Sequence, residues 1–238
     1  MTLSETMIIV TAIIEIAMIL FILHMPPGRS IRAFAKLMII NMFLIAIFGG
    51  RTKEVFGHAT NIGNIMFAAV LLAQAIVVRR WGRIAALENV VMIFIAMVIM
   101  FVLAQTIKYT PAAPGDPIAE SINAVLSGSA KVAHASFVAF AIVQYVFVEA
   151  MWRLRDWPTW LSYGLTAVAA QALDSAIFFG VAFGASADIE TIIGMAVVGF
   201  VIKAGFAMLT VPIVAAARVG KHPCEGCPMA FTHSWPLP

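Results

Sequence analysis

Residues 88–107 read ENVVMIFIAMVIMFVLAQTI and contain no charged side chain after Glu88. A helix needs about 20 mainly apolar residues to cross the hydrocarbon core of a bilayer, so this stretch predicts a transmembrane helix. The whole chain has the same character, because its 238 residues are 62% hydrophobic and 11% charged, with mean hydropathy +0.99. Soluble domains are typically about 45–50% apolar and about 25% charged. The composition therefore excludes a water-soluble globule.

Seven apolar runs follow one another along the chain. They predict an all-α integral membrane protein, a bundle of about seven transmembrane helices, with spans at residues 7–25, 33–49, 62–79, 88–107, 132–152, 159–184 and 191–217. The longest connection, residues 108–129, contains Pro111, Pro114 and Pro117 and is expected to be an extracellular loop. Residues 1–238 thus form one polytopic membrane domain with no room for a soluble one.

The basic residues predict the orientation in a plasma or inner membrane. Ten of the fifteen Lys and Arg residues follow the first, third, fifth and seventh spans: Arg29, Arg32, Lys36, Arg79, Arg80, Arg83, Arg153, Arg155, Arg218 and Lys221. Cytoplasmic loops carry the excess of positive residues. We therefore expect the N-terminus outside and the C-terminus in the cytoplasm, and we assign the net charge of +3 to orientation and not to nucleic-acid binding.

The connection at residues 49–64, GGRTKEVFGHATNIGN, is polar and punctuated by glycine. An interrupted hydrophobic segment is a sequence pointer to a transporter binding site. An ordinary outside loop accounts for it equally well.

Charged residues inside spans are costly and usually face a cavity or a partner. The sixth span contains AAQALDSAIFFG at residues 169–180, which places Gln171, Asp174 and Ser175 on one helical face, and Lys203 lies in the seventh span. Asp174 and Lys203 are expected to pair. Such a pair either locks two helices together or acts directly on a substrate or proton.

Uncharged amides make up a second set of candidate site residues. Asn41, Asn64, Gln74 and Gln144 all fall in or beside spans. Each alone fits a hydrogen bond between helices, but together they predict a polar cavity for a flat, neutral solute. Glu149 precedes Arg153 by four residues, which predicts a surface ion pair, and Glu15 receives no role.

The tail at residues 219–238 contains the remaining chemical motif. A zinc site is one interpretation of Cys224, Cys227, His222 and His233, although their spacing is irregular; reduced free thiols are the other. No hydrolase, metalloprotease or Walker motif is present. We therefore expect no enzyme activity and no cofactor, with a small-molecule substrate and the lipid membrane as partners; a homo-oligomer stays open.

Several of these polar positions occur in an order that resembles the VUT family of vitamin uptake transporters, which includes queuosine precursor transporters. The similar segments are NIGNIMFA at residues 61–68, KVAHASF at 131–137, QALDSAIFF at 171–179, and Lys203 with Pro212. The resemblance runs from about residue 29 to 218. It implies a six-helix core over residues 29–218, an extra N-terminal helix at about 7–25 and a cytoplasmic tail.

The resemblance further implies a secondary carrier that imports a 7-deazaguanine base or a similar heterocycle. On this basis Gln171 and Asp174 would bind the edge of the base, Lys203 would hold Asp174 ionised or compete with a coupling proton, and Asn64 and Gln144 would complete the cavity. Ala75 and Phe147 stand where the family tends to have acidic residues, which leaves the substrate and the coupling ion open.

Two other functions fit the sequence less well. Seven helices with a lysine in the last one also describe a retinal protein, in which Lys203 would form a Schiff base, but residues 62–79 contain no carboxylate. A membrane scaffold or assembly subunit would use the same polar residues for stability alone.

Overall fold

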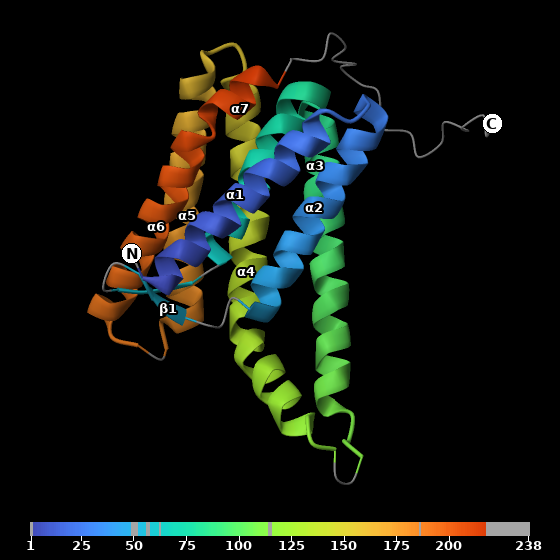
Figure 1. Cartoon of the computed structure of the whole chain (residues 1–238), viewed down its shortest axis with the longest axis vertical. Coiled ribbons are helices and arrows are strands. Elements are labelled where there is room, and N and C mark those ends of the chain that lie inside the picture. The colour runs from blue at the N-terminus through green and yellow to red at the C-terminus, as the bar shows by residue number, and fades with distance from the viewer. Residues whose placement is uncertain are drawn as a thin grey trace, which may run out of the picture.

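The computed structural model describes residues 2–48, 52–55, 58–61, 63–113, 116–185 and 187–217. Its elements are α1 (Leu3–Leu23), α2 (Pro27–Phe48), β1 (Thr52–Val55), β2 (His58–Asn61), α3 (Gly63–Tyr109), α4 (Ala119–Arg153), the π-helix η1 (Trp160–Leu165), α5 (Thr166–Phe183), α6 (Ile189–Leu209) and α7 (Val211–Ala216). The chain is a helical membrane bundle, as the sequence predicts (Figure 1).

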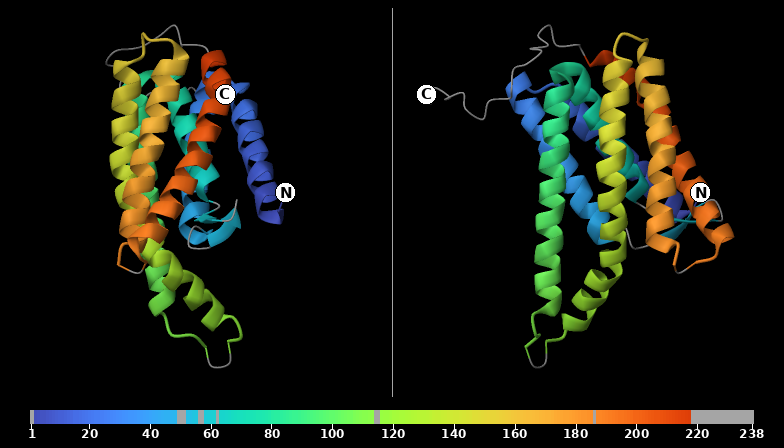
Figure 2. Two further views of the ribbon diagram at one scale, coloured as in Figure 1. Left: turned by 90° about the vertical axis from the view of Figure 1, so that its left-hand side faces the viewer. Right: turned by 180° about the vertical axis from the view of Figure 1, so that it is seen from behind.

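Six helices in the described part of the chain are long and apolar enough to cross a membrane. The longest, α3, is two helices joined at Gly82, where the backbone has φ 89° and ψ −180°. Gln74 Nε2 donates a 2.6 Å hydrogen bond to the Ala86 carbonyl across this point. Twelve residues of straight helix would span about 18 Å, so the chain doubles back, as Figures 1 and 2 show. The prediction of separate third and fourth spans is confirmed.

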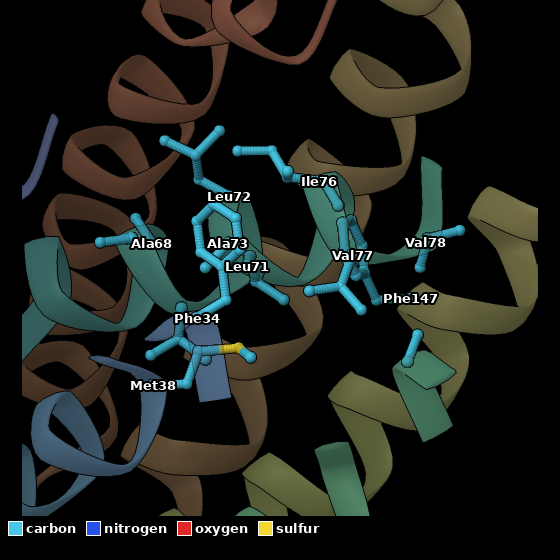
Figure 3. Packing of buried hydrophobic residues seen from close by; sticks show 14 of the residues in the cluster. Phe34, Met38, Ala68, Leu71, Leu72, Ala73, Ile76, Val77, Val78 and Phe147 are labelled. Carbon is cyan, nitrogen blue, oxygen red and sulfur yellow. The ribbon is translucent and has the colours of Figure 1, made fainter. Parts of the chain in front are cut away.

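The first half of α3 is the central helix of the bundle. Nearly every side chain from Phe67 to Val78 is buried, because α2, α4 and α6 all pack against α3. Figure 3 shows Phe34 and Met38 of α2 and Phe147 of α4 among the residues of this core. A helix that is apolar on all sides belongs in such a position, which makes the buried Gln74 an exception.

Local sequence signals define the helix ends. Thr2 and Glu5 form a reciprocal capping box at the start of α1, and α2 begins with Pro27, a residue favoured at the first helical position. Asp188 caps α6 by accepting hydrogen bonds from the Thr191 backbone N–H and hydroxyl. These bonds lower the pKa of Asp188, so the cap is intact at neutral pH and is lost only when the pH falls through that lowered pKa.

Two predicted connections contain regular structure instead. Helix α4 begins at Ala119, so the second half of the expected loop at residues 108–129 is helical, and α3 and α4 extend beyond the other helices at this end (Figure 2). The connection at residues 49–64 holds an antiparallel hairpin with Thr52 opposite Asn61. Strand β1 packs against α1 and β2 against α6. Proline and glycine content therefore predicted where the chain turns, but it did not predict the early start of α4 or the hairpin of β1 and β2.

Candidate substrate site

Five helices meet at a pocket that contains the buried ion pair. Its lining is contributed by α2, α3, α4, α5 and α6 and consists of Ile45, Gly63, Asn64, Phe67, Ser136, Asp174, Phe178 and Lys203. Because Gly63 is the first residue of α3, the pocket lies toward the end of the bundle where that helix begins. Three of the predicted substrate residues, Asn64, Asp174 and Lys203, are brought together here.

Asp174 and Lys203 pair as the sequence predicts. Lys203 Nζ donates to Asp174 Oδ2 at 2.5 Å, and their side chains are only 1% and 7% exposed. The ammonium also lies 5.8 Å from the centre of the Phe67 ring, within the range of a cation–π contact. Two opposite charges with little access to water stabilise each other only while both are present. A solute that enters this pocket meets this ion pair, because both residues line it.

Polar atoms without partners lie along the same faces of α4 and α5. Gln144 and Gln171 are buried, and among the described residues neither the amide oxygen nor the amide nitrogen of either has a hydrogen-bond partner; the hydroxyls of Ser136 and Ser175 are likewise unpaired there. Buried polar groups are almost always hydrogen-bonded in folded proteins, so each unpaired one calls for a partner. These groups are therefore free to bind water or a polar solute.

Gln144 and Gln171 lie deeper in the helix bundle than the residues that line the pocket. Gln171 precedes Asp174 by about one helical turn, and Gln144 follows Ser136 by about two turns. Because α4 and α5 run in opposite directions (Figure 1), both displacements lead away from the end where α3 begins. The unpaired amides thus extend the polar surface from the pocket into the bundle.

The other two predicted residues are engaged elsewhere. Asn41 Nδ2 donates to Glu15 Oε2 at 2.9 Å, and Gln74 donates to the Ala86 carbonyl, which leaves only its oxygen unpaired. Neither lines the pocket. Their partners, a carboxylate 26 residues away and a backbone carbonyl beyond a chain reversal, leave no local sequence signal.

The sequence did not identify Ser136, Phe67 and Phe178 as lining residues. Ser136 occupies a buried position on the same face of α4 as Gln144, so helical periodicity applied to Gln144 would have found it. Phenylalanine is too common in membrane helices to carry such a signal. The tail residues Cys224, Cys227, His222 and His233 lie outside the described residues, and within those residues no group of three or more His, Cys, Asp or Glu could hold a metal ion.

The opposite, basic end of the bundle is tied together by polar bonds. Arg83 Nε donates to Glu149 at 2.5 Å between α3 and α4, so the predicted pairing of Glu149 with Arg153 is wrong. Arg79 donates to the Thr159 hydroxyl at 2.9 Å, and the Tyr163 and Thr210 hydroxyls are 2.9 Å apart. These bonds connect α3, α4, η1 and the end of α6 on the side away from the pocket.

Gly199 of α6 packs closely against Phe179 and against the pocket residue Asn64. A Cβ at this position would lie 2.9 Å from Phe179 Cε2 and 3.2 Å from Asn64 Nδ2. We expect Gly199→Ala to displace Asn64 and to abolish substrate binding, with a loss of unfolding free energy of about 1–3 kcal/mol from overpacking. Ligand-induced thermal shifts measure the first effect, and melting temperatures without ligand the second.

Gly194→Ala in the same helix is the matched control, because its added Cβ would meet no described atom within 4 Å outside the helix's own backbone. Normal ligand-induced shifts in Gly199→Ala would contradict the placement of Asn64 in the site.

Comparison with known proteins gives two results that bear on this site. A family model described as "Putative vitamin uptake transporter" matches residues 61–217, which is more than half of the chain and includes every pocket residue except Ile45. A "Probable queuosine precursor transporter" of Bacillus subtilis (strain 168) is 24% identical over 174 residues, which cover 71% of this chain and 76% of the relative. No solved structure matches the chain.

Proposed function

Because the chain belongs to the vitamin uptake transporter family, we propose that it is a secondary transporter that imports a queuosine precursor, a 7-deazaguanine base. Such a base is flat and neutral and presents hydrogen-bond donors and acceptors along one edge. The relative from Bacillus subtilis is named for this substrate class. The observation that carries the proposal is the set of unpaired, buried amides next to the Asp174–Lys203 pair.

The chemistry of the pocket suits this class of solute. Amide groups offer both a donor and an acceptor without a net charge, so Gln171, Asn64 and Gln144 can bind the complementary edge of a base. Asp174 can accept from ring or amino N–H groups. Phe67 and Phe178 line the same pocket and can pack against the faces of a planar ring.

The arrangement of the two ends supports an alternating-access mechanism. The pocket lies toward the end where α3 begins, whereas the bonds from Arg83 to Glu149 and from Arg79 to Thr159 link the helices at the other end. With the N-terminus outside, this state would receive substrate from the outer side. Release into the cytoplasm would then require the bonds at the basic end to open.

Import can be tested in cells that cannot synthesise queuosine precursors. We expect expression of this chain to restore tRNA modification at low external concentrations of the base, and Gln171→Ala or Asp174→Asn to reduce uptake at least tenfold. Gln105→Ala, a half-buried glutamine outside the pocket, serves as the control and should transport normally.

Each failure of this experiment has a distinct meaning. Absence of rescue by the wild-type chain, when the protein is present in the membrane, would show that the substrate is wrong. Normal uptake by both Gln171→Ala and Asp174→Asn would show that the site is wrong. A change in stability alone in these two variants would favour the scaffold interpretation. Retinal binding, the third interpretation, predicts a visible absorbance band that Lys203→Ala abolishes.

A further inference from the structure

A second buried carboxylate lies outside the pocket, on helix α1. Glu15 is 5% exposed, although it sits in the middle of an apolar helix. Its hydrogen-bond partner is the amide of Asn41 on α2, which donates at 2.9 Å, and Asn41 is itself 2% exposed. Both residues precede the segment that matches the transporter family, so the family match gives them no role.

No cation compensates Glu15 among the described side chains. The ion pairs there are Arg83–Glu149, Arg155–Asp156 and Lys203–Asp174. Helix α1 packs against α2, α3 and β1, whose charged residues are Arg29, Arg32, Lys36, Lys53, Glu54, Arg79, Arg80, Arg83, Glu88 and Lys108. Of these, Arg80 bonds to the carbonyl of Leu23, about two turns beyond Glu15. A lone carboxylate in an apolar setting is costly while charged, and protonation removes that charge.

The pair is also close to the pocket along α2. Asn41 and Ile45 are four residues apart and therefore lie on one face of the helix, one turn from each other. Ile45 lines the pocket. A charged Glu15 can only accept hydrogen bonds, whereas a protonated one also offers a donor. Gain or loss of the proton therefore changes the hydrogen bonds available to Asn41, one turn from the pocket residue Ile45.

We propose that Glu15, positioned by Asn41, is a proton-binding site that couples proton entry to movement of the substrate. The carboxylate takes one proton from the outer side and gives one up to the cytoplasmic side in each cycle. The proton site stands on the geometry of α1 and α2, while its coupling to transport rests on the proposed function.

The proton site is tested first, without substrate, by infrared spectroscopy of the purified full-length protein. We expect a carbonyl band from a protonated carboxyl group at neutral pH that Glu15→Gln removes and that Asn41→Leu shifts in frequency. Glu190→Gln, at an exposed position, and Lys53→Gln should leave the band unchanged. A band that survives in Glu15→Gln would overturn the proposal. A band that grows in Lys53→Gln would also overturn it, because Lys53 would then be the partner.

Coupling is tested in liposomes containing the protein and supplied with the base. Glu15→Gln should exchange substrate across the membrane at the wild-type rate and lose accumulation driven by a pH gradient. Wild-type accumulation in Glu15→Gln would overturn the coupling. If the wild-type protein exchanges no base at all, the proposed substrate fails, while the infrared band still decides whether Glu15 binds a proton.

Discussion

Lys203→Met is expected to lower the free energy of unfolding by about 3–5 kcal/mol, because it leaves the Asp174 carboxylate buried without its partner. The ammonium of Lys203 is 2.5 Å from that carboxylate and 1% exposed, so water cannot replace it in the folded state. Thermal denaturation in detergent, followed by size-exclusion chromatography, measures the loss. Uptake of the base should be abolished in the same variant.

A double variant separates the structural role of the pair from its role in transport. Replacing a buried ion pair with apolar residues of similar size is often neutral or stabilising. Asp174→Leu combined with Lys203→Met should therefore recover most of the lost stability without recovering transport. If the double variant transports the base normally, the pair serves only to hold α5 and α6 together. If Lys203→Met alone melts at the wild-type temperature, the pair contributes nothing to the fold.

Gly82→Ala should lower the free energy of unfolding by about 1–3 kcal/mol, because its φ and ψ fall in a region that residues with a Cβ essentially do not adopt. The added Cβ would meet nothing closer than Trp152 Cζ3 at 3.8 Å, so the expected loss is conformational and not steric. The reversal at Gly82 allows Gln74 to bond with the Ala86 carbonyl. Melting temperatures of the purified variant measure the effect.

The control is Gly180→Ala in α5, where the backbone is helical and the added Cβ would meet no atom of the described residues within 4 Å beyond the helix's own backbone. Alanine is favoured over glycine in a helix interior by about 1 kcal/mol, so this variant should be at least as stable as the wild type. Equal melting temperatures for Gly82→Ala and the wild type would show that the turn tolerates a side chain.

The spans were predictable because the membrane imposes one requirement, a long apolar segment, that a sequence displays directly. Asp174 and Lys203 were predictable for the same reason, because a charged residue within an apolar segment stands out and needs a partner or a cavity. Tertiary partners were not predictable. Arg83, and not Arg153, pairs with Glu149, because the reversal at Gly82 brings α3 alongside α4. The roles of the seven predicted substrate residues stay predictions until the variants are measured.

The π-helix η1 affects the orientation of Gln171 and Asp174, because it directly precedes α5 in the same span. Its first turn is bonded at the basic end, through Thr159 to Arg79 and through Tyr163 to Thr210. A π turn holds one residue more than an α turn, and each residue of an α-helix corresponds to about 100° of rotation. If the π turn moved along the helix, Gln171 and Asp174 would rotate about the helix axis while the bonded end stayed in place. The position of the π turn therefore sets the direction in which Gln171 and Asp174 face relative to the anchored end of the helix.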